Sequence, residues 1–280
     1  MSIRNRQTVR DVQHKILYII KYIDSICRKN GIEYYIMGGT ALGAIRHGGF
    51  IPWDDDLDIF MTPREYEKFK KAFKEENTIE FYLQEWRTTE KYLEYAKVRL
   101  NGTTFIEENF KNREDMHHGI FVDIMILHKV PENKFIQKIV YVESKFVTLY
   151  GISQRNWKPK TKMQEVALRA LKILPSKFLA TIFYRRIYRY DALKKNYKYC
   201  YWITPAKFKN GLFDKSFFSE PIDIPFEDTT LMGSKHIKEY LSYRYGNYMK
   251  LPSEAEQKAA VHAMLFDVNN DYKLYMNKEK

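Results

Sequence analysis

The sequence predicts an α+β fold, in which a mixed β-sheet is flanked by helices and followed by a mainly helical C-terminal part. Residues 9–27 place apolar side chains at helical spacing, whereas residues 32–37 and 119–127 are short apolar runs typical of buried strands. Helical and strand periods therefore alternate along the first half of the chain, and two further helical patterns follow in the second half.

The composition is that of a globular protein. The chain has 280 residues, of which 45% are apolar, and only two cysteines, Cys27 and Cys200. So few cysteines argue against a disulfide framework and fit a reducing compartment. Residues 1–10 lack the apolar core of a signal peptide, and no run of about 18 apolar residues occurs. We therefore expect a cytoplasmic protein without a membrane span.

Local signals define the first elements. The opening helix ends at Asn30-Gly31, a C-terminal left-handed signal, and should pack on the sheet. Residues 62–65 (TPRE) form a capping box that starts a helix reaching to about residue 74. Strands are then predicted over residues 79–84, 95–100 and 103–106, the last two joined as a hairpin by Asn101-Gly102.

Four carboxylates are crowded into residues 54–60 (DDDLDIF). Carboxylates this close repel one another unless a cation lies among them. Because apolar residues alternate with them as in a strand, Asp56 and Asp58 should share one face and Asp55 should point to the other. This pattern predicts that Asp56 and Asp58 bind a divalent cation, Mg²⁺ or Mn²⁺. The alternative is an acidic surface loop.

A glycine turn precedes these carboxylates. The strand over residues 32–37 ends in Gly38-Gly39-Thr40, and a helix follows. Glycine lets the backbone approach an anion, and the free N–H groups at the start of a helix attract it. We therefore expect a phosphate-binding turn beside the cation, the alternative being an ordinary tight turn. Arg46 and His47 stand where the following loop could reach the same ligand.

Asp123 is a lone carboxylate in the apolar run over residues 119–127. A hard cation needs more oxygen ligands than one strand supplies, so a third carboxylate from a neighbouring strand is expected. Asp123 would hold a second metal ion or act as a general base, and the sequence does not separate these roles. A buried salt bridge to Lys or Arg is the other interpretation. Lys97 and Arg99, on one face of a neighbouring strand, can bind phosphates, although such residues are more often solvated.

The net charge of +12 is concentrated in one segment. Residues 155–198 contain thirteen basic residues and two acidic ones, interleaved with apolar residues at helical spacing around residues 163–174 and 178–187. Two basic amphipathic helices of this kind can lie on an anionic membrane surface. The alternative is a packed helical pair with a solvated basic face. No nucleic-acid recognition motif accompanies the charge, so no nucleic-acid partner is expected.

The motifs taken together resemble one family. The stretch over residues 38–58 (GGTALGAIRHGGFIPWDDDLD), the run up to Asp123, and residues 245–252 (YGNYMKLP) with His262 beyond them are similar to the LicD/fukutin-type phosphotransferases of the nucleotidyltransferase superfold. Residues 34–127 and 226–262 match well, and residues 131–225 match little. One departure is the spacing between glycines and carboxylates, which the loop over residues 46–53 lengthens relative to the wider superfold.

The resemblance implies a function and several site residues. It implies a nucleotidyltransferase-like catalytic core over residues 1–130 and a helical, basic region over residues 131–280 that completes the site within one compact unit. Asp54 resembles a further family acid, and Tyr245 and His262 are included because they belong to the shared C-terminal motif. The implied reaction moves a phospho-alcohol, first of all phosphocholine, from a CDP-activated donor to a sugar hydroxyl of a cell-surface glycan precursor such as teichoic acid or lipopolysaccharide. Whether the acceptor is free or lipid-linked stays open.

Other functions stay open at this stage. CDP-ribitol or CDP-glycerol would serve the same chemistry. A nucleotidyltransferase would instead hand a nucleotide to a small molecule or RNA. A binding protein with inactive chemistry is disfavoured, because Asp56, Asp58 and Asp123 are all present.

Overall fold

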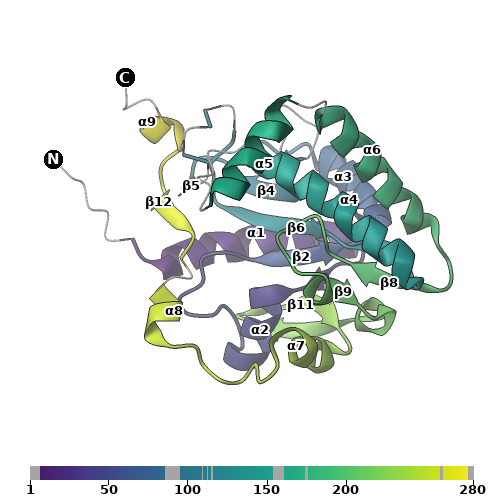
Figure 1. The fold of residues 1–280 in the computed structure, drawn as a ribbon. Helices are drawn as coiled ribbons and strands as arrows, with labels where there is room; N and C mark the ends of the chain where they lie inside the picture. Colours follow the sequence, from purple (N-terminus) through teal and green to yellow (C-terminus); the bar gives the residue numbers. More distant parts are fainter. Residues whose placement is uncertain are drawn as a thin grey trace.

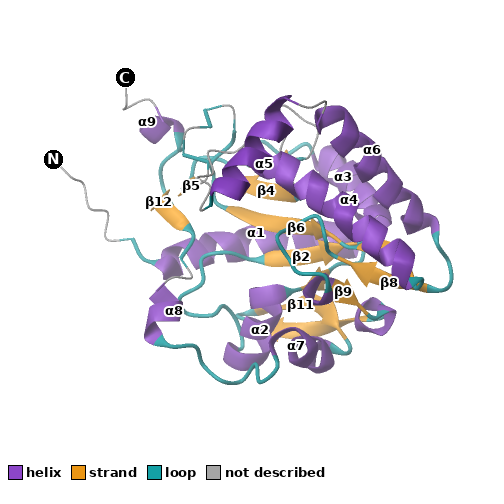
Figure 2. Ribbon diagram, in the orientation of Figure 1, coloured by secondary structure: helices purple, strands orange, loops and turns teal. Residues whose placement is uncertain are grey.

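The computed structural model describes residues 7–85, 95–108, 110–111, 113–114, 116–153, 161–173, 176–258 and 261–276. Within them the main sheet has five strands, in the order β1-β2-β6-β4-β3. The strands gather in the middle of the molecule and helices lie outside them (Figures 1 and 2). In chain order the strands of this sheet are β1 (Tyr35–Ile36), β2 (Asp58–Met61), β3 (Phe81–Gln84), β4 (Ala96–Leu100) and β6 (Phe121–Ile126).

The sheet is mixed, as predicted. β2 and β6 run parallel, whereas the pairs β1–β2, β4–β6 and β3–β4 are antiparallel. β6 is central and every one of its residues is buried. Such a strand reads as a continuous apolar run because both of its faces are covered, which makes a carboxylate within it conspicuous.

Helix α1 (Val9–Lys29) packs against β4 and β6. Its inward face carries buried isoleucines, and burying each such side chain stabilises the fold by about 1.5–3 kcal/mol. Helix α3 (Pro63–Glu76) begins where the capping signal predicts, because the Thr62 side chain accepts a hydrogen bond from the Glu65 N–H. Both helices therefore follow from local sequence.

The glycine turn leads from β1 into helix α2 (Gly38–His47), which confirms the predicted order of strand, turn and helix. Gly38 has a φ of +54°, a conformation that a side chain would oppose. At its other end the helix stops at Gly48, which has a φ of +72°. α2 packs against β2 and against helix α7 (Ile237–Tyr245).

The C-terminal part is not mainly helical, and that prediction is wrong. Helices α4 (Lys134–Ser153), α5 (Lys162–Ile173) and α6 (Ser176–Arg189) are followed by several small sheets. β9 has only two residues, and β10 contains Pro221 and Pro225, so the sequence has no clear alternating pattern there. The remaining strands are β7 (His128–Pro131), β8 (Tyr197–Cys200), β9 (Leu212–Phe213), β10 (Pro221–Phe226), β11 (Thr229–Ser234) and β12 (Ala263–Asp267), and the remaining helices are α8 (Glu254–Lys258), α9 (Lys273–Met276) and 3₁₀ turns at Tyr190–Ala192, Lys209–Gly211 and Lys215–Phe218.

The predicted hairpin is also wrong. The Asn101-Gly102 turn forms, with Gly102 at a φ of +74°, but β5 (Thr104–Glu107) pairs with β12 and not with β4. Both edges of β4 are already occupied by β3 and β6, so the turn leads β5 away from the main sheet. β12, which lies far along the chain from β5, is thereby brought next to the main sheet.

The basic segment is only partly described. Arg155, Lys158 and Lys160 lie outside the described residues, whereas α5 and α6 confirm the two predicted helices. In the described ranges, none of the helices has the length and hydropathy needed to cross a bilayer.

Candidate active site

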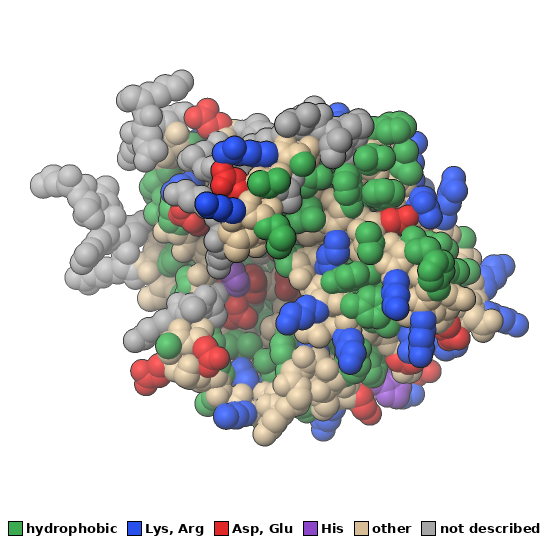
Figure 3. Space-filling view, viewed as in Figure 1, with side chains coloured by type: hydrophobic (Ala, Val, Ile, Leu, Met, Phe, Trp, Pro, Cys, Tyr) green, Lys and Arg blue, Asp and Glu red, His purple; other side chains and the backbone are tan. Residues whose placement is uncertain are grey.

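Acidic side chains and a histidine gather in a hollow on one face of the molecule (Figure 3). Beneath them, three charged residues lie side by side across the main sheet. Asp58 of β2 is paired with Asp123 of β6, and Asp123 is paired on its other side with Lys97 of β4. Residues in register on neighbouring strands point to the same face, so all three side chains project together. The expectation that Asp123 stands on a strand next to that of Asp58 is confirmed.

Lys97 is buried and forms an ion pair with Asp123. The Lys97 Nζ lies 2.8 Å from Asp123 Oδ1 and 3.8 Å from Glu107 Oε2, and 3.2 Å from the centre of the Phe121 ring. Burial raises the pKa of Asp123 to about 6, although Lys97 opposes the shift. The structure thus contains the buried salt bridge that was one interpretation of Asp123. Lys97 is not on a solvated edge, and its charge is directed at carboxylates inside the protein.

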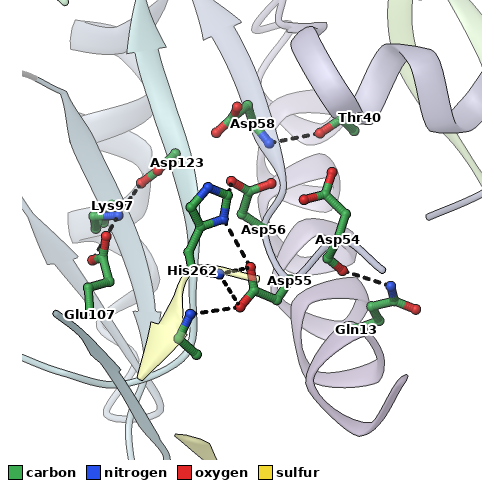
Figure 4. Close-up of polar contacts among 11 residues, drawn as sticks. Gln13, Thr40, Asp54, Asp55, Asp56, Asp58, Lys97, Glu107, Asp123 and His262 are labelled. Carbon is green, nitrogen blue, oxygen red and sulfur yellow. Dashed lines mark hydrogen bonds and ion pairs between the residues drawn. The ribbon is translucent and has the colours of Figure 1, made fainter. Parts of the chain in front are cut away.

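Asp54, Asp56 and His262 form a cluster of potential metal ligands. One ligand atom from each lies within 4.8 Å of the others, and Figure 4 shows the His262 ring facing Asp56. His262 Nδ1 is 3.5 Å from Asp56 Oδ2. Burial and the charge of Asp56 raise the pKa of Asp54 to about 8, while His262 opposes the shift. Burial also raises the pKa of Asp56. This is the behaviour of carboxylates crowded in a place with too little positive charge.

Asp58 lies near this cluster, at the start of β2, but is not one of its three members. Burial, followed by the negative charges of Asp56 and Asp123, raises the pKa of Asp58 well above its ordinary value. Its backbone N–H donates to Thr40 Oγ1 at 2.9 Å, which ties the start of β2 to the first turn of α2. A Cβ on Gly38 would lie 3.6 Å from Asp58 Oδ2, so the carboxylate is next to the glycine turn.

Asp55 is the feature that sequence reasoning missed. Its side chain is fully buried, but it does not point away from Asp56 as predicted, because Asp55 Oδ1 and Asp56 Oδ2 lie 3.0 Å and 3.5 Å from the same His262 Nδ1. It accepts hydrogen bonds from the backbone N–H groups of His262 and Ala263, both at 2.9 Å, and lies 3.0 Å from His262 Nδ1. This hydrogen bond and the charges of Asp56 and Asp55 raise the pKa of His262 to about 9, against the effect of burial. Asp55 therefore positions β12 and fixes the His262 ring.

The glycine turn lies against the carboxylates. A Cβ built on Gly39 would lie 2.8 Å from Asp54 Oδ2, so only glycine fits without a shift of Asp54. The Gly38 N–H donates to the Tyr240 hydroxyl at 3.1 Å. Among the described residues, none accepts a hydrogen bond from the N–H of Gly39 or Thr40, as is usual for the first turn of a helix. The turn thus presents donors beside the acidic cluster.

The other predicted residues lie farther from the cluster or are engaged elsewhere. Arg46 donates to the carbonyl oxygen of Tyr248 at 3.0 Å, and His47 packs against Trp53. The Tyr245 hydroxyl would lie 3.8 Å from a Cβ on Gly38, which places this residue at the turn. Arg99 is buried and donates to the Gly119 carbonyl oxygen at 2.7 Å and to Gln84.

Two sets of contacts left no signal in the sequence. One is that of Asp55 with the start of β12, and the other is that of Lys97 with Glu107. Asp55 binds residues 207 and 208 positions later in the chain, and local periodicity does not report such a separation. The alternating pattern predicts that Asp55 lies opposite Asp56, whereas both carboxylates approach His262.

Comparison with known proteins agrees with this geometry. A family model described as the LicD/FKTN/FKRP nucleotidyltransferase domain matches residues 31–148. Lipopolysaccharide cholinephosphotransferase LicD of Haemophilus influenzae is 30% identical over 259 residues, which cover 90% of this chain and 95% of that protein. The chain belongs to the LicD family. It is a LicD-type phosphotransferase.

Two further relatives match shorter stretches. Human ribitol 5-phosphate transferase FKRP is 44% identical over 39 residues, covering 14% of this chain and 8% of that protein. An uncharacterized protein of Rickettsia prowazekii is 30% identical over 139 residues, covering 48% of each chain. The family resemblance drawn from the motifs is thus confirmed.

Replacing Asp55 with alanine should lower the free energy of unfolding by about 1–3 kcal/mol, because two backbone donors lose their buried acceptor. Hydrogen exchange at the amides of His262 and Ala263 should accelerate. Asp228→Ala is the matched control, because Asp228 is an exposed carboxylate paired with Lys21. Unchanged protection of these two amides in Asp55→Ala would contradict the positioning role.

Proposed function

We propose that this phosphotransferase moves phosphocholine from CDP-choline to a sugar hydroxyl of a cell-surface glycan precursor, such as lipopolysaccharide or teichoic acid. The observation that carries the proposal is the match over 90% of the chain to a protein named as a lipopolysaccharide cholinephosphotransferase. The carboxylate cluster beside a helix N-terminus supports it, because donors for phosphate and acidic ligands for a cation stand together.

A divalent cation suits the residues of the cluster. Asp54, Asp56 and Asp58 offer carboxylate oxygens, which Mg²⁺ and Mn²⁺ prefer. Burial, followed by repulsion from neighbouring carboxylates, raises the pKa of Asp54 and Asp58, and a bound cation would favour their charged forms. If cation binding displaces the proton of His262, its ring would add a nitrogen ligand close to Asp54 and Asp56, which Mn²⁺ accepts more readily than Mg²⁺. When bound, such a cation would neutralise charge on the phosphates of the donor.

Groups of the protein itself would bind the donor phosphate and take the proton of the acceptor hydroxyl. The N–H groups of Gly39 and Thr40 would bind a donor phosphate, and the positive end of the α2 dipole would favour it. We assign Asp123 the role of a general base that takes the proton of the acceptor hydroxyl, and not that of a ligand for a second cation. The Lys97 ammonium at 2.8 Å would repel a second cation, and a pKa of about 6 is close to that of an effective general base. Lys97 would hold the Asp123 side chain in position both before and after it takes the proton.

A second function uses the same site. A nucleotidyltransferase would transfer the nucleotide itself to a small molecule or RNA, and the matching family model carries the nucleotidyltransferase name. CDP-ribitol is a further donor to test, because a stretch of 39 residues matches a ribitol 5-phosphate transferase. CDP-glycerol would follow the same chemistry.

The identity of the released product separates these functions. With Mg²⁺ or Mn²⁺, CDP-choline and a sugar acceptor, we expect CMP to be released and phosphocholine to appear on the acceptor. Parallel reactions with CDP-ribitol, CDP-glycerol and CTP provide the comparison, read by chromatography of the nucleotides. Release of pyrophosphate from CTP without release of CMP would overturn the proposal in favour of nucleotide transfer.

Asp56→Asn and Asp58→Asn should each abolish turnover, by on the order of a thousandfold, while leaving the fold intact. Removing one of several mutually repelling charges should keep or raise the melting temperature of the metal-free protein. Mg²⁺ and Mn²⁺ should raise the melting temperature of the wild type and lose this effect in the variants. Asp228→Asn, which removes an exposed carboxylate, is the control. Near wild-type transfer by either variant would show that these residues do not bind the metal.

Gly39→Val should weaken binding of CDP-choline by about tenfold or more, because a side chain would stand where backbone donors meet phosphate. Gly39→Ala should give a smaller loss, since its Cβ contacts only the flexible end of Asp54. Calorimetric titration with CDP-choline and Mg²⁺ measures the affinity, and thermal melting checks the fold. If affinity is unchanged in a folded Gly39→Val protein, the turn does not bind phosphate.

A further inference from the structure

Helix α4 is apolar on two opposite faces, but the described part of the structure covers only one of them. Val140, Val147 and Tyr150 are buried in a second hydrophobic cluster with α6 and β8. On the other side Phe135 and Val142 are 72% and 66% exposed, and Leu149 is 42% exposed. A helix that is apolar all round is normally buried, so this outer face requires a partner.

The exposed face continues onto the neighbouring helices. Met163 and Val166 of α5 are 80% and 67% exposed, and Phe178 of α6 is 66% exposed. Between α4 and α5 lies an open groove whose lining includes Leu149, Ile152, Met163 and Leu168. Large apolar side chains exposed on three neighbouring helices are typical of an interaction surface.

The helices that carry this surface are also rich in basic residues. α4, α5 and α6 together contain ten lysines and arginines and two glutamates. Both glutamates are neutralised by neighbours: Arg186 Nη1 lies 3.0 Å from Glu143, and Arg169 Nη2 lies 2.6 Å from Glu165. Figure 3 shows hydrophobic side chains interleaved with blue basic ones over the part of the surface formed by α4 and α5.

This combination favours a bilayer with anionic lipids over other partners. Basic side chains around an apolar stripe supply the electrostatic and the hydrophobic halves of interfacial binding. Nucleic acid would use the charge but not the exposed apolar residues. The acidic hollow opens on the same side of the molecule as this surface, as Figure 3 shows both in one view. A molecule lying on this surface would hold the hollow close to the lipid head groups.

We propose that the exposed face of α4 and α5, hereafter the docking face, binds the surface of an anionic membrane, with α6 contributing charge at its edge. Residues such as Phe135, Val142, Met163 and Val166 enter the boundary between head groups and acyl chains. Lys134, Lys138 and Lys162 contact the anionic head groups. The docking face differs from the segment predicted from sequence, because α4 supplies much of its apolar part. The inference goes beyond the proposed function and does not depend on which donor is used.

The experiment is co-sedimentation with vesicles of phosphatidylcholine alone or mixed with phosphatidylglycerol, over a range of salt concentrations. The wild type should sediment with the mixed vesicles only, and salt should weaken the binding because charges are screened beyond about 8 Å at physiological salt. The variant Lys134→Gln/Lys138→Gln/Lys162→Gln should lose about a hundredfold in partitioning, since each charge contributes about fivefold. The control Lys29→Gln/Lys71→Gln/Lys235→Gln removes the same charge elsewhere and should bind like the wild type.

A second variant and its control test the apolar contribution to membrane binding. Phe135→Ser/Val142→Ser/Met163→Ser/Val166→Ser should lose the binding that persists at high salt, and because these side chains are exposed the protein should stay folded. Ile79→Ser/Met249→Ser/Leu274→Ser changes exposed apolar residues on other elements and is the control.

Three results would overturn the proposal. One is equal, negligible sedimentation with both kinds of vesicle. Another is an equal loss of binding in the control lysine variant, which would mean that net charge acts without a defined face. The third is a dimer in lipid-free sedimentation equilibrium that the four-serine variant abolishes, because a second copy of the chain would then cover the docking face. None of these results depends on turnover, so the proposed function is tested separately.

Discussion

The structure depends on how it holds several negative charges in one buried place. Asp54, Asp56, Asp58 and Asp123 all have raised pKa values, because burial and mutual repulsion disfavour their charged forms. Two cations of the protein partly compensate this charge: Lys97 lies beside Asp123, and His262 lies beside Asp54 and Asp56. The parallel pairing of β2 and β6 creates the crowding, and the antiparallel pairing of β4 brings in the lysine. The negative charge that remains is what makes the cluster suited to a divalent cation.

Local signals predicted the elements that depend on neighbouring residues. The glycine turn before α2, the threonine cap of α3 and the apolar run of β6 each act within a few positions, and the structure has all of them. Pairing between strands is different, because it depends on which edges are free. The Asn101-Gly102 turn is a strong hairpin signal, yet β4 had no free edge to offer β5. The small C-terminal sheets were not predicted, because β10 contains two prolines and β9 has only two residues.

The candidate site also has features that local sequence predicts and features that it does not. Carboxylates among apolar residues are conspicuous, so Asp56, Asp58 and Asp123 could be selected from sequence, although the strand begins only at Asp58. The sequence did not predict the hydrogen bonds of Asp55 to His262 and Ala263, which direct its carboxylate to the same histidine as that of Asp56. Lys97 could be selected as a basic residue near the site, but only the register shows that its partner is Asp123. Residue type thus identifies the chemistry, whereas the topology of the sheet decides which charges meet.

The hydrogen bonds between Asp55 and the start of β12 also bear on how the protein folds. The partners are separated by more than 200 residues, so closing this contact costs chain entropy that no local interaction repays in advance. Helices α1 and α3 can form early from their own sequences, while the histidine can reach the carboxylates only once the intervening chain is in place. During synthesis the acidic residues precede their histidine by the same interval. We therefore expect the cluster to form late in folding, after distant parts of the chain have come into contact.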